Sequence, residues 1–267
     1  MKLGLSSYTY GWAVGVRGDG LLQPLDEHGL LDRCRDYGLK LLQIGDNLPL
    51  HSFDGSRLTR LADRALSDGV QLEVGARRLT AERVAAYAVI ARRVGARLIR
   101  FVIDDVDYHP TPEAVTEVLR DAVPTLDGLT LGLENHDRFA VRTLRQVVES
   151  VSSDCVGICL DTANSLGAGE GLETVLRELA PFTVNLHLKD FIIKRVPYLM
   201  GFTVEGRPAG EGTLDIPKLL GEFAPCRRCG TATLELWTPP ETQLADTLVK
   251  EASWADRSVG YLRPMFD

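Results

Sequence analysis

The sequence predicts an α/β fold, a single-domain (β/α)₈ TIM barrel over residues 1–267, on three observations. Short apolar runs rich in β-branched residues alternate with longer segments of helical periodicity along the chain. There are eight such runs, which is the number that closes this barrel, and 267 residues suit one barrel. No G-x-G-x-x-G turn follows the first run, which disfavours a doubly wound open sheet.

The eight expected strands are short, and several are apolar almost throughout, as parallel strands covered on both faces should be. They are Lys2–Ser6, Lys40–Gly45, Gln71–Val74, Leu98–Ile103, Leu129–Glu134, Val156–Asp161, Thr183–Leu188 and Thr231–Leu236.

The segments between the strands carry recognisable helix ends. Thr111–Glu113 supplies an N-cap, a proline at the first helical position and a carboxylate in the first turn. Arg83–Val94 has apolar residues at helical spacing and stops at Gly95, a residue typical of helix C-termini. Asp215–Phe223 and Gln243–Leu262 are expected to be the last two helices.

One connection, residues 190–215, is much longer than the others. Long connections in compact domains usually serve function. This one leaves the carboxyl end of the seventh strand, where active sites of such barrels lie, so we expect a loop that acts as a lid.

Composition limits the classes of function. A net charge of −7 and a pI near 5.3 disfavour a nucleic-acid partner, because phosphate backbones are bound by clustered Lys and Arg. No apolar stretch approaches a membrane span and no signal peptide is evident, so we expect a cytoplasmic protein without a membrane partner. The five cysteines fit a reducing compartment. The Cys226–Cys229 pair lacks the second ligand pair of a zinc site, and we interpret it as structural.

Four polar residues interrupt the apolar strands near their carboxyl ends. They are Glu134, Asp161, His187 and Glu235, on the fifth to eighth expected strands. A charged group inside a barrel strand is costly unless it is paired or bound to a metal. Three carboxylates at one end of the barrel would also repel one another without a cation between them.

The sequence therefore predicts one divalent metal ion bound by these four residues. Three carboxylates and one imidazole suit Mn²⁺, Mg²⁺ or Co²⁺ in octahedral geometry, with Zn²⁺ as the alternative. Two coordination positions would stay open for substrate oxygens or water.

The motifs around these residues carry a family resemblance. Leu133–His136, Leu160–Ser165, His187–Asp190 and Leu234–Leu236 resemble the xylose isomerase-like TIM barrels, as does the segment Gly210–Asp215. That group includes sugar epimerases, hydroxypyruvate isomerase, inosose dehydratase and the endonuclease IV group. The resemblance covers essentially the whole chain and implies a metal-dependent enzyme, with homodimers or homotetramers frequent among its relatives.

The resemblance also implies roles for single residues. Glu134 and Glu235 would be catalytic proton-transfer groups on opposite faces of a bound hydroxycarbonyl sugar, with Asp161 and His187 mainly as ligands. Lys189 follows His187 by two positions, so it points the same way along the strand and could stabilise an oxyanion.

Other residues are candidates for substrate binding. His136 is either a contact to a substrate hydroxyl or a supporting loop histidine. Asn164 stands where related enzymes commonly place a histidine, which argues against the multinuclear endonuclease arrangement. Arg195 and Arg207 on the long connection could bind a carboxylate or phosphate, or could lie at the surface. Further candidates are Trp12 and Trp237 as sugar-stacking walls, with packing as the alternative, and Glu73 as a pocket carboxylate.

The leading functional prediction is a sugar isomerase or epimerase that works through an enediolate on a small sugar or sugar acid. The alternative keeps the metal and changes the reaction to a lyase. It would decarboxylate a 3-oxo sugar acid or dehydrate a keto-cyclitol. Met200–Gly210 is similar to 3-oxo-isoapionate decarboxylase-like members of the group. A nucleic-acid repair enzyme would need more histidine ligands, and a non-catalytic sugar-binding barrel would be expected to lose the glutamate pair.

Overall fold

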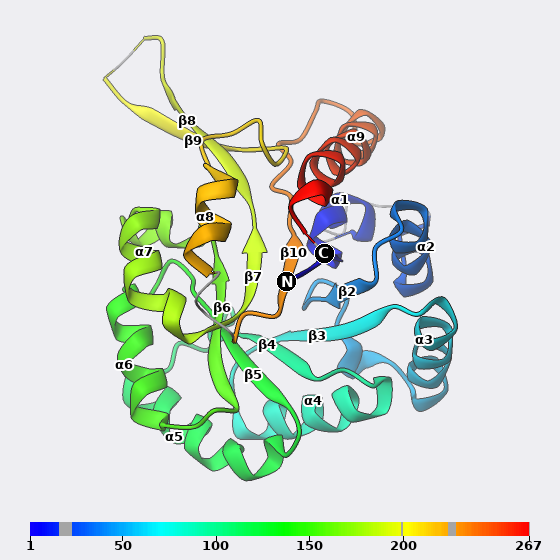
Figure 1. Ribbon diagram of the computed structural model, residues 1–267, viewed down its shortest axis with the longest axis vertical. Coiled ribbons are helices and arrows are strands. Elements are labelled where there is room, and N and C mark those ends of the chain that lie inside the picture. Colours follow the sequence, from blue (N-terminus) through cyan, green and yellow to red (C-terminus); the bar gives the residue numbers. More distant parts are fainter. Residues whose placement is uncertain (16–22, 199, 224–227, 267) are drawn as a thin grey trace.

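Eight parallel strands close into a barrel in the computed structural model, and helices surround it (Figure 1). The structure describes residues 1–15, 23–198, 200–223 and 228–266. The strands follow one another around the barrel in the order β1-β10-β7-β6-β5-β4-β3-β2. Each strand of this order pairs in parallel with its neighbours, which confirms the (β/α)₈ TIM barrel.

The barrel strands lie where the apolar runs predicted them. They are β1 (Lys2–Ser6), β2 (Leu41–Ile44), β3 (Gln71–Arg77), β4 (Leu98–Val102), β5 (Thr130–Glu134), β6 (Val156–Asp161), β7 (Thr183–Leu188) and β10 (Thr231–Leu234). The last strand is shorter than expected, and Glu235 follows it directly. The Glu235 amide still donates to the Leu188 carbonyl at 3.0 Å, so the backbone continues alongside β7 at this position.

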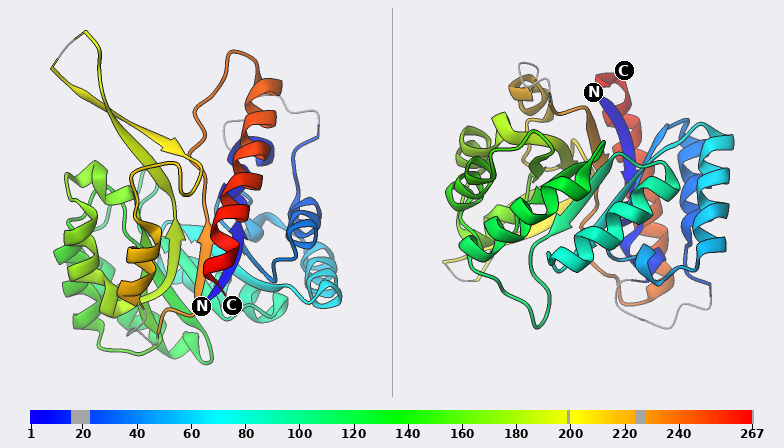
Figure 2. Two further views of the ribbon diagram at one scale, coloured as in Figure 1. Left: turned by 45° about the horizontal axis from the view of Figure 1, so that its top comes forward. Right: turned by 90° about the horizontal axis from the view of Figure 1, so that it is seen from below.

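Helices cover the outside of the barrel, as the views from two further sides show (Figure 2). They are α1 (Gly11–Val14), α2 (Glu27–Tyr37), α3 (Gly55–Asp68), α4 (Ala81–Val94), α5 (Pro112–Ala122), α6 (Val141–Val151), α7 (Leu172–Leu179), α8 (Ile216–Phe223) and α9 (Leu244–Leu262). The helix ends identified in the sequence are confirmed. The Thr111 side chain accepts from the Ala114 amide at the start of α5, and Gly95 ends α4 with a φ of 73°.

The segment expected to be a long loop after β7 is mostly a hairpin. Strands β8 (Asp190–Arg195) and β9 (Phe202–Arg207) pair in antiparallel register outside the barrel sheet. The hairpin projects beyond the outline of the barrel (Figures 1 and 2). Its base stays close to the chain after β10, because a Cβ at Gly206 would lie only 1.9 Å from the Trp237 carbonyl oxygen.

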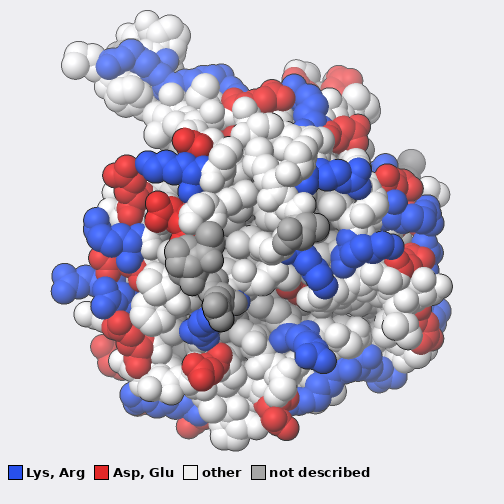
Figure 3. Space-filling view, viewed as in Figure 1, with Lys and Arg blue, Asp and Glu red and all other residues white. Residues whose placement is uncertain are grey.

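Over the face of the molecule in Figure 3, Lys and Arg side chains are interspersed with Asp and Glu side chains. Among the described residues, every helix is too short or too polar to cross a bilayer.

Of the predicted structural cysteine pair, Cys226 lies outside the described residues, and Cys229 is buried.

Asp190 holds the chain that returns from the hairpin. Its side chain is 2% exposed and accepts hydrogen bonds from the amides of Phe191, Gly210, Gly212 and Leu214 at 2.8–3.1 Å. A carboxylate that accepts several backbone N–H groups is a strong local constraint. It fixes the loop between β9 and α8 against the end of β7.

We expect Asp190→Ala to lower the free energy of unfolding by about 3 kcal/mol or more, because it leaves several buried backbone donors without an acceptor. Urea unfolding followed by circular dichroism measures the change. Asp63→Ala, on the exposed side of α3, serves as the control and should stay within about 0.5 kcal/mol of the parent. Equal effects of the two substitutions would contradict this account.

Candidate active site

Four side chains from consecutive barrel strands meet at the carboxyl end of the barrel. They are Glu134, Asp161 and His187 from the ends of β5, β6 and β7, and Glu235 directly after β10. None is more than 3% exposed. Register explains the convergence, since Asp161 pairs with His187 across β6 and β7.

The donor atoms of this group have the spacing of a metal site. His187 Nδ1 lies 3.3 Å from Glu235 Oε1 and 3.8 Å from Glu134 Oε2. One donor atom each of Asp161, His187 and Glu235 lie within 4.8 Å of one another. An octahedral ion with bonds of about 2.1 Å sets neighbouring ligand atoms roughly 3 Å apart and opposite ones roughly 4 Å apart.

Three of these atoms are also without an aligned hydrogen bond within the described part of the chain. They are Glu134 Oε2, Asp161 Oδ2 and His187 Nδ1. Each of these atoms lies in an ion pair but lacks an aligned hydrogen bond, which is compatible with a cation bound between them. Asp161, His187 and Glu235 therefore fit a single divalent ion, and Glu134 Oε2 lies beside them at 3.8 Å from His187 Nδ1.

A second group of donor side chains consists of Glu134, Cys159 and His187. Burial raises the pKa of the Cys159 thiol well above its ordinary value, with a further contribution from the nearby carboxylates. A thiol must lose its proton to bind a metal. The oxygen-rich group that includes Asp161 and Glu235 is therefore the better site.

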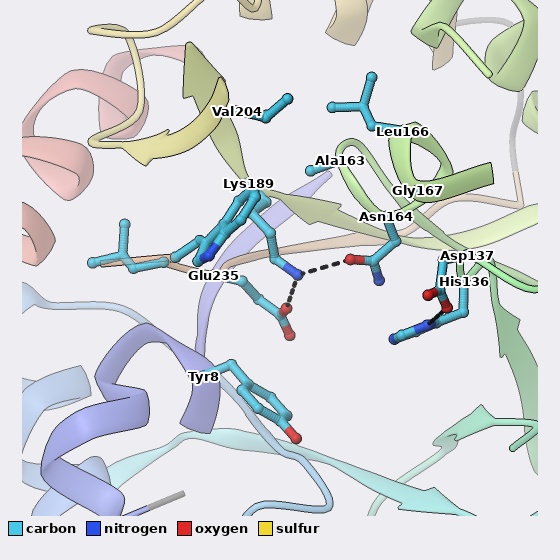
Figure 4. Close-up of a pocket in the computed structure, with 12 residues that line it drawn as sticks. Tyr8, His136, Asp137, Ala163, Asn164, Leu166, Gly167, Lys189, Val204 and Glu235 are labelled. Atoms are coloured by element: carbon cyan, nitrogen blue, oxygen red, sulfur yellow. Dashed lines mark hydrogen bonds and ion pairs between the residues drawn. The ribbon is translucent and has the colours of Figure 1, made fainter. Parts of the chain in front are cut away.

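Lys189 brings a positive charge to the same place. Its Nζ lies 2.8 Å from Asp161 Oδ2 and 3.1 Å from Glu235 Oε2, and it donates to Asn164 Oδ1 at 3.4 Å (Figure 4). Burial by itself would lower the pKa of Lys189, but attraction to the surrounding carboxylates outweighs burial and raises it. The ammonium group thus remains charged.

The pKa of Glu235 moves in the opposite direction. Burial would raise it, but the charges of His187, Lys189 and Arg100 together lower it below its ordinary value. In this arrangement Glu235 is an ionised and weakly basic carboxylate.

Arg100 is a part of the site that the sequence analysis missed. This side chain is 2% exposed and lies on β4, where its guanidinium forms ion pairs with Glu134 and Asp46. Asp46 in turn accepts a hydrogen bond from Tyr8 Oη at 3.1 Å. The signal was present in the sequence, because Arg100 interrupts the apolar run Leu98–Val102 just as Glu134 interrupts the next one.

Asn164 occupies a defined position between two charged groups. Its amide nitrogen donates to Glu134 Oε1 at 2.8 Å, and its amide oxygen accepts from Lys189. Its backbone amide donates to Asp161 Oδ1 at 2.8 Å. Asn164 therefore connects Glu134, Asp161 and Lys189 rather than adding a charge.

The cavity above these residues has a volume of about 510 Å³. Lys189, Asn164 and Glu235 face it from the barrel, while His136 stands at one side, paired with Asp137 at 2.7 Å (Figure 4). Among the described residues that line it, Lys189 is the only Lys or Arg. Val204 from β9 also lines the cavity, so the hairpin base forms part of its wall.

Both predicted tryptophans lie at the rim. Trp237 is 46% exposed and lines this cavity as well as an adjoining hollow of about 290 Å³. Trp12 lines only the adjoining hollow, where its Nε1 donates to the Thr238 carbonyl at 2.8 Å.

Three other predicted substrate residues lie elsewhere. Arg195 is on the projecting half of the hairpin, 4.9 Å above the ring of Phe202. Arg207 pairs with Glu205 at 3.0 Å, and neither arginine lines the cavity. Glu73 is buried inside the barrel beneath the site.

Residues 22–264 match the sequence profile of the family described as xylose isomerase-like TIM barrel. The chain belongs to this family. Its four-residue donor group at the ends of β5, β6, β7 and β10 is thus the candidate active site of a xylose isomerase-like barrel.

Similar proteins within and beyond the family differ in activity. A 3-oxo-isoapionate decarboxylase from Pectobacterium atrosepticum is 31% identical over 264 residues, covering 98% of this chain and 95% of that protein. The crystal structure of D-psicose 3-epimerase from Clostridium cellulolyticum superposes with a TM-score of 0.73 at 14% identity, covering 98% of this chain and 97% of that one. A xylose isomerase-like barrel from Mycobacterium smegmatis, in complex with magnesium, has a TM-score of 0.71 at 13% identity, with the same coverage.

We expect Arg100→Met to lower the free energy of unfolding by about 3–5 kcal/mol, because Glu134 and Asp46 would stay buried without their shared cation. Denaturant unfolding with and without divalent metal would measure this loss. Arg97→Met, at an exposed position before β4, is the matched control. A loss below about 1 kcal/mol would show that Arg100 does not stabilise the carboxylates.

Proposed function

We propose that this xylose isomerase-like barrel binds one divalent metal ion through Glu134, Asp161, His187 and Glu235. The spacing of the donor atoms and the buried atoms without aligned hydrogen bonds support this proposal. Mn²⁺, Mg²⁺ or Co²⁺ suit the oxygen-rich set best, and Zn²⁺ is the alternative. When bound, the ion would hold two oxygens of the substrate and stabilise negative charge on its carbonyl oxygen.

We further propose that the reaction is the decarboxylation of a 3-oxo sugar acid. The observation that carries this choice is the ammonium group of Lys189, which faces the cavity beside Asp161 and Glu235. Loss of CO₂ from a 3-oxo acid breaks the bond between C1 and C2 and leaves its electron pair as an enolate on the C3 oxygen. A fixed cation at this oxygen lowers the energy of the charge that develops there.

The charges of the two glutamates agree with this chemistry. Decarboxylation needs no base to remove a proton from carbon, and Glu235 has a lowered pKa because of neighbouring cations. Glu134 is likewise engaged, by Arg100 on one oxygen and by Asn164 on the other. A proton supplied from solvent then replaces the carboxylate on C2. The full-length similarity to a 3-oxo-isoapionate decarboxylase points to the same reaction class.

Substrate contacts follow from the cavity lining. His136 and Asn164 are placed to hydrogen-bond to hydroxyl groups, and Trp237 offers an apolar face at the rim. We propose no substrate contact for Arg195, Arg207 or Glu73, since none of them lines the cavity. Lys189 takes the role of the cation expected near an acidic substrate.

A metal-dependent isomerase or epimerase remains the second candidate. Glu134 at the end of β5 and Glu235 directly after β10 both approach His187 Nδ1, and proton transfer at a sugar carbon can use two such carboxylates. This reaction requires at least one of the two glutamates to become a stronger base when metal and substrate are bound.

Removing metal with a chelator should lower the melting temperature, and Mn²⁺ or Mg²⁺ should restore it, because an ion that binds only the folded state stabilises it. His187→Ala should abolish the restoration. His109→Ala removes an exposed histidine in the loop before α5 and should leave the recovery of the melting temperature unchanged. A melting temperature that never responds to divalent ions would contradict the metal site.

Activity distinguishes the two reactions. With 3-oxo-isoapionate and Mn²⁺ we expect CO₂ release, and in D₂O we expect deuterium in the product at the carbon that was C2 of the substrate. Lys189→Met should reduce kcat by about 10²–10³-fold, the usual effect of losing a group that stabilises an oxyanion. Lys218→Met, on the exposed side of α8, is the control. Isomer formation from a ketose panel without CO₂ would assign the isomerase instead.

A further inference from the structure

Beneath His187 lies a layer of buried polar side chains that does not face the cavity. Gln43, Glu73 and Asn185 come from β2, β3 and β7, and none is more than 1% exposed. Gln43 Oε1 lies 2.7 Å from His187 Nε2, the ring nitrogen that points away from the carboxylates. The contact links the layer directly to the candidate metal site.

The neighbours of Gln43 determine which end of its amide faces the histidine. Its Nε2 donates to Glu73 Oε2 at 3.0 Å and to Asn185 Oδ1 at 3.2 Å, which uses both amide hydrogens. The Asn185 amide nitrogen likewise donates to Thr231 Oγ1 at 2.8 Å and to Glu73 Oε2 at 3.3 Å. Turning Gln43 over by itself would set its oxygen against Asn185 Oδ1, so with Asn185 as placed the acceptor of Gln43 faces His187.

An acceptor on this side requires a hydrogen on His187 Nε2. Cys159 Sγ is also near, at 3.1 Å from Nε2, but it lies 3.0 Å from Asn185 Oδ1. Its thiol hydrogen is therefore directed to Asn185, and the hydrogen on Nε2 is left for Gln43. In a neutral imidazole a hydrogen on one nitrogen leaves a lone pair on the other.

We propose that Gln43, held in place by Glu73 and Asn185, is a positioning residue that fixes His187 in its Nε2–H tautomer. Nδ1 then presents a lone pair to the point where Glu134, Asp161 and Glu235 converge. This inference rests on the proposed metal site and adds the residue that prepares one of its ligands. Metal-binding histidines commonly donate their second ring N–H to a neighbouring acceptor, which sets the tautomer.

The alternative tautomer shows why the site needs such a residue. Nδ1 lies 3.3 Å from Glu235 Oε1 and 3.8 Å from Glu134 Oε2. Both carboxylates would attract a hydrogen to Nδ1, where it would occupy the ligand direction and exclude a metal ion. The hydrogen bond at Nε2 opposes that attraction. Glu73, predicted from sequence as a pocket carboxylate, thus acts through Gln43.

Nitrogen-15 NMR of the metal-free protein tests the tautomer directly. The chain has five histidines, and His187→Gln identifies the signal of interest by its loss. In the parent protein we expect a hydrogen on Nε2 and none on Nδ1. Gln43→Met should move the hydrogen to Nδ1. Should that variant unfold, Gln43→Asn, one methylene shorter, also withdraws the acceptor and should give the same shift.

A rescue variant and a control separate this effect from general damage. In Gln43→Glu the new carboxyl shares a proton with Glu73 and keeps an oxygen facing Nε2, so the parent tautomer should return. Gln71→Met makes the same change at a half-buried site on β3, outside this layer, and should alter nothing. Calorimetry with Mn²⁺ should show a 10–100-fold loss of affinity for Gln43→Met and parent-like affinity for Gln43→Glu.

The outcomes separate this inference from the proposed function. An Nε2–H tautomer with parent-like Mn²⁺ affinity in Gln43→Met would overturn the role of Gln43. A tautomer that moves as expected, in a parent protein that releases no CO₂, would support the role of Gln43 and reject the decarboxylase. A parent protein with its hydrogen on Nδ1 would overturn the inference at once.

Discussion

The balance of buried charge at the carboxyl end of the barrel governs the rest of this structure. Glu134, Asp161 and Glu235 lose almost all contact with water, and such burial is tolerated only where opposite charge is close. Arg100 and Lys189 provide part of that charge from two further barrel positions. Three carboxylates still exceed these two cations, and Arg100 is also shared with Asp46. The proposed divalent ion would complete the balance.

The two cations also decide what the metal site can do. Neighbouring cations lower the pKa of Glu235, and a carboxylate with a lowered pKa is a poor base for removing a proton from carbon. A charged Lys189 that faces the cavity favours a reaction in which negative charge appears on a substrate oxygen. Similarity in fold to an epimerase and full-length similarity to a decarboxylase are therefore compatible with distinct reactions, because the residues around the donor group set its electrostatics.

The barrel contributes rigidity on both sides of this site. Below it, Gln43, Glu73 and Asn185 satisfy one another's hydrogen bonds inside the barrel, which gives His187 one fixed orientation. Above it, the hairpin base adds Val204 to the cavity wall, and Asp190 fixes the chain that returns from the hairpin. The strands thus hold the donor group, while the long connection after β7 contributes to the wall of the cavity.

The sequence by itself determined the barrel and its donor group, because both depend on local patterns. Parallel barrel strands are buried on both faces and are therefore apolar at nearly every position. A polar residue within such a run is easily recognised in the sequence. Only the tertiary structure decided which side chains contact one another in the site. Packing between segments far apart in the chain decides which cation pairs with Glu134 and whether Arg195 and Arg207 reach the cavity. The pairing of β8 with β9 was also visible only in the structure. Arg100 illustrates the limit, since its interruption of β4 was visible, but its contacts with Glu134 on β5 and with Asp46 after β2 exist only once the barrel has formed.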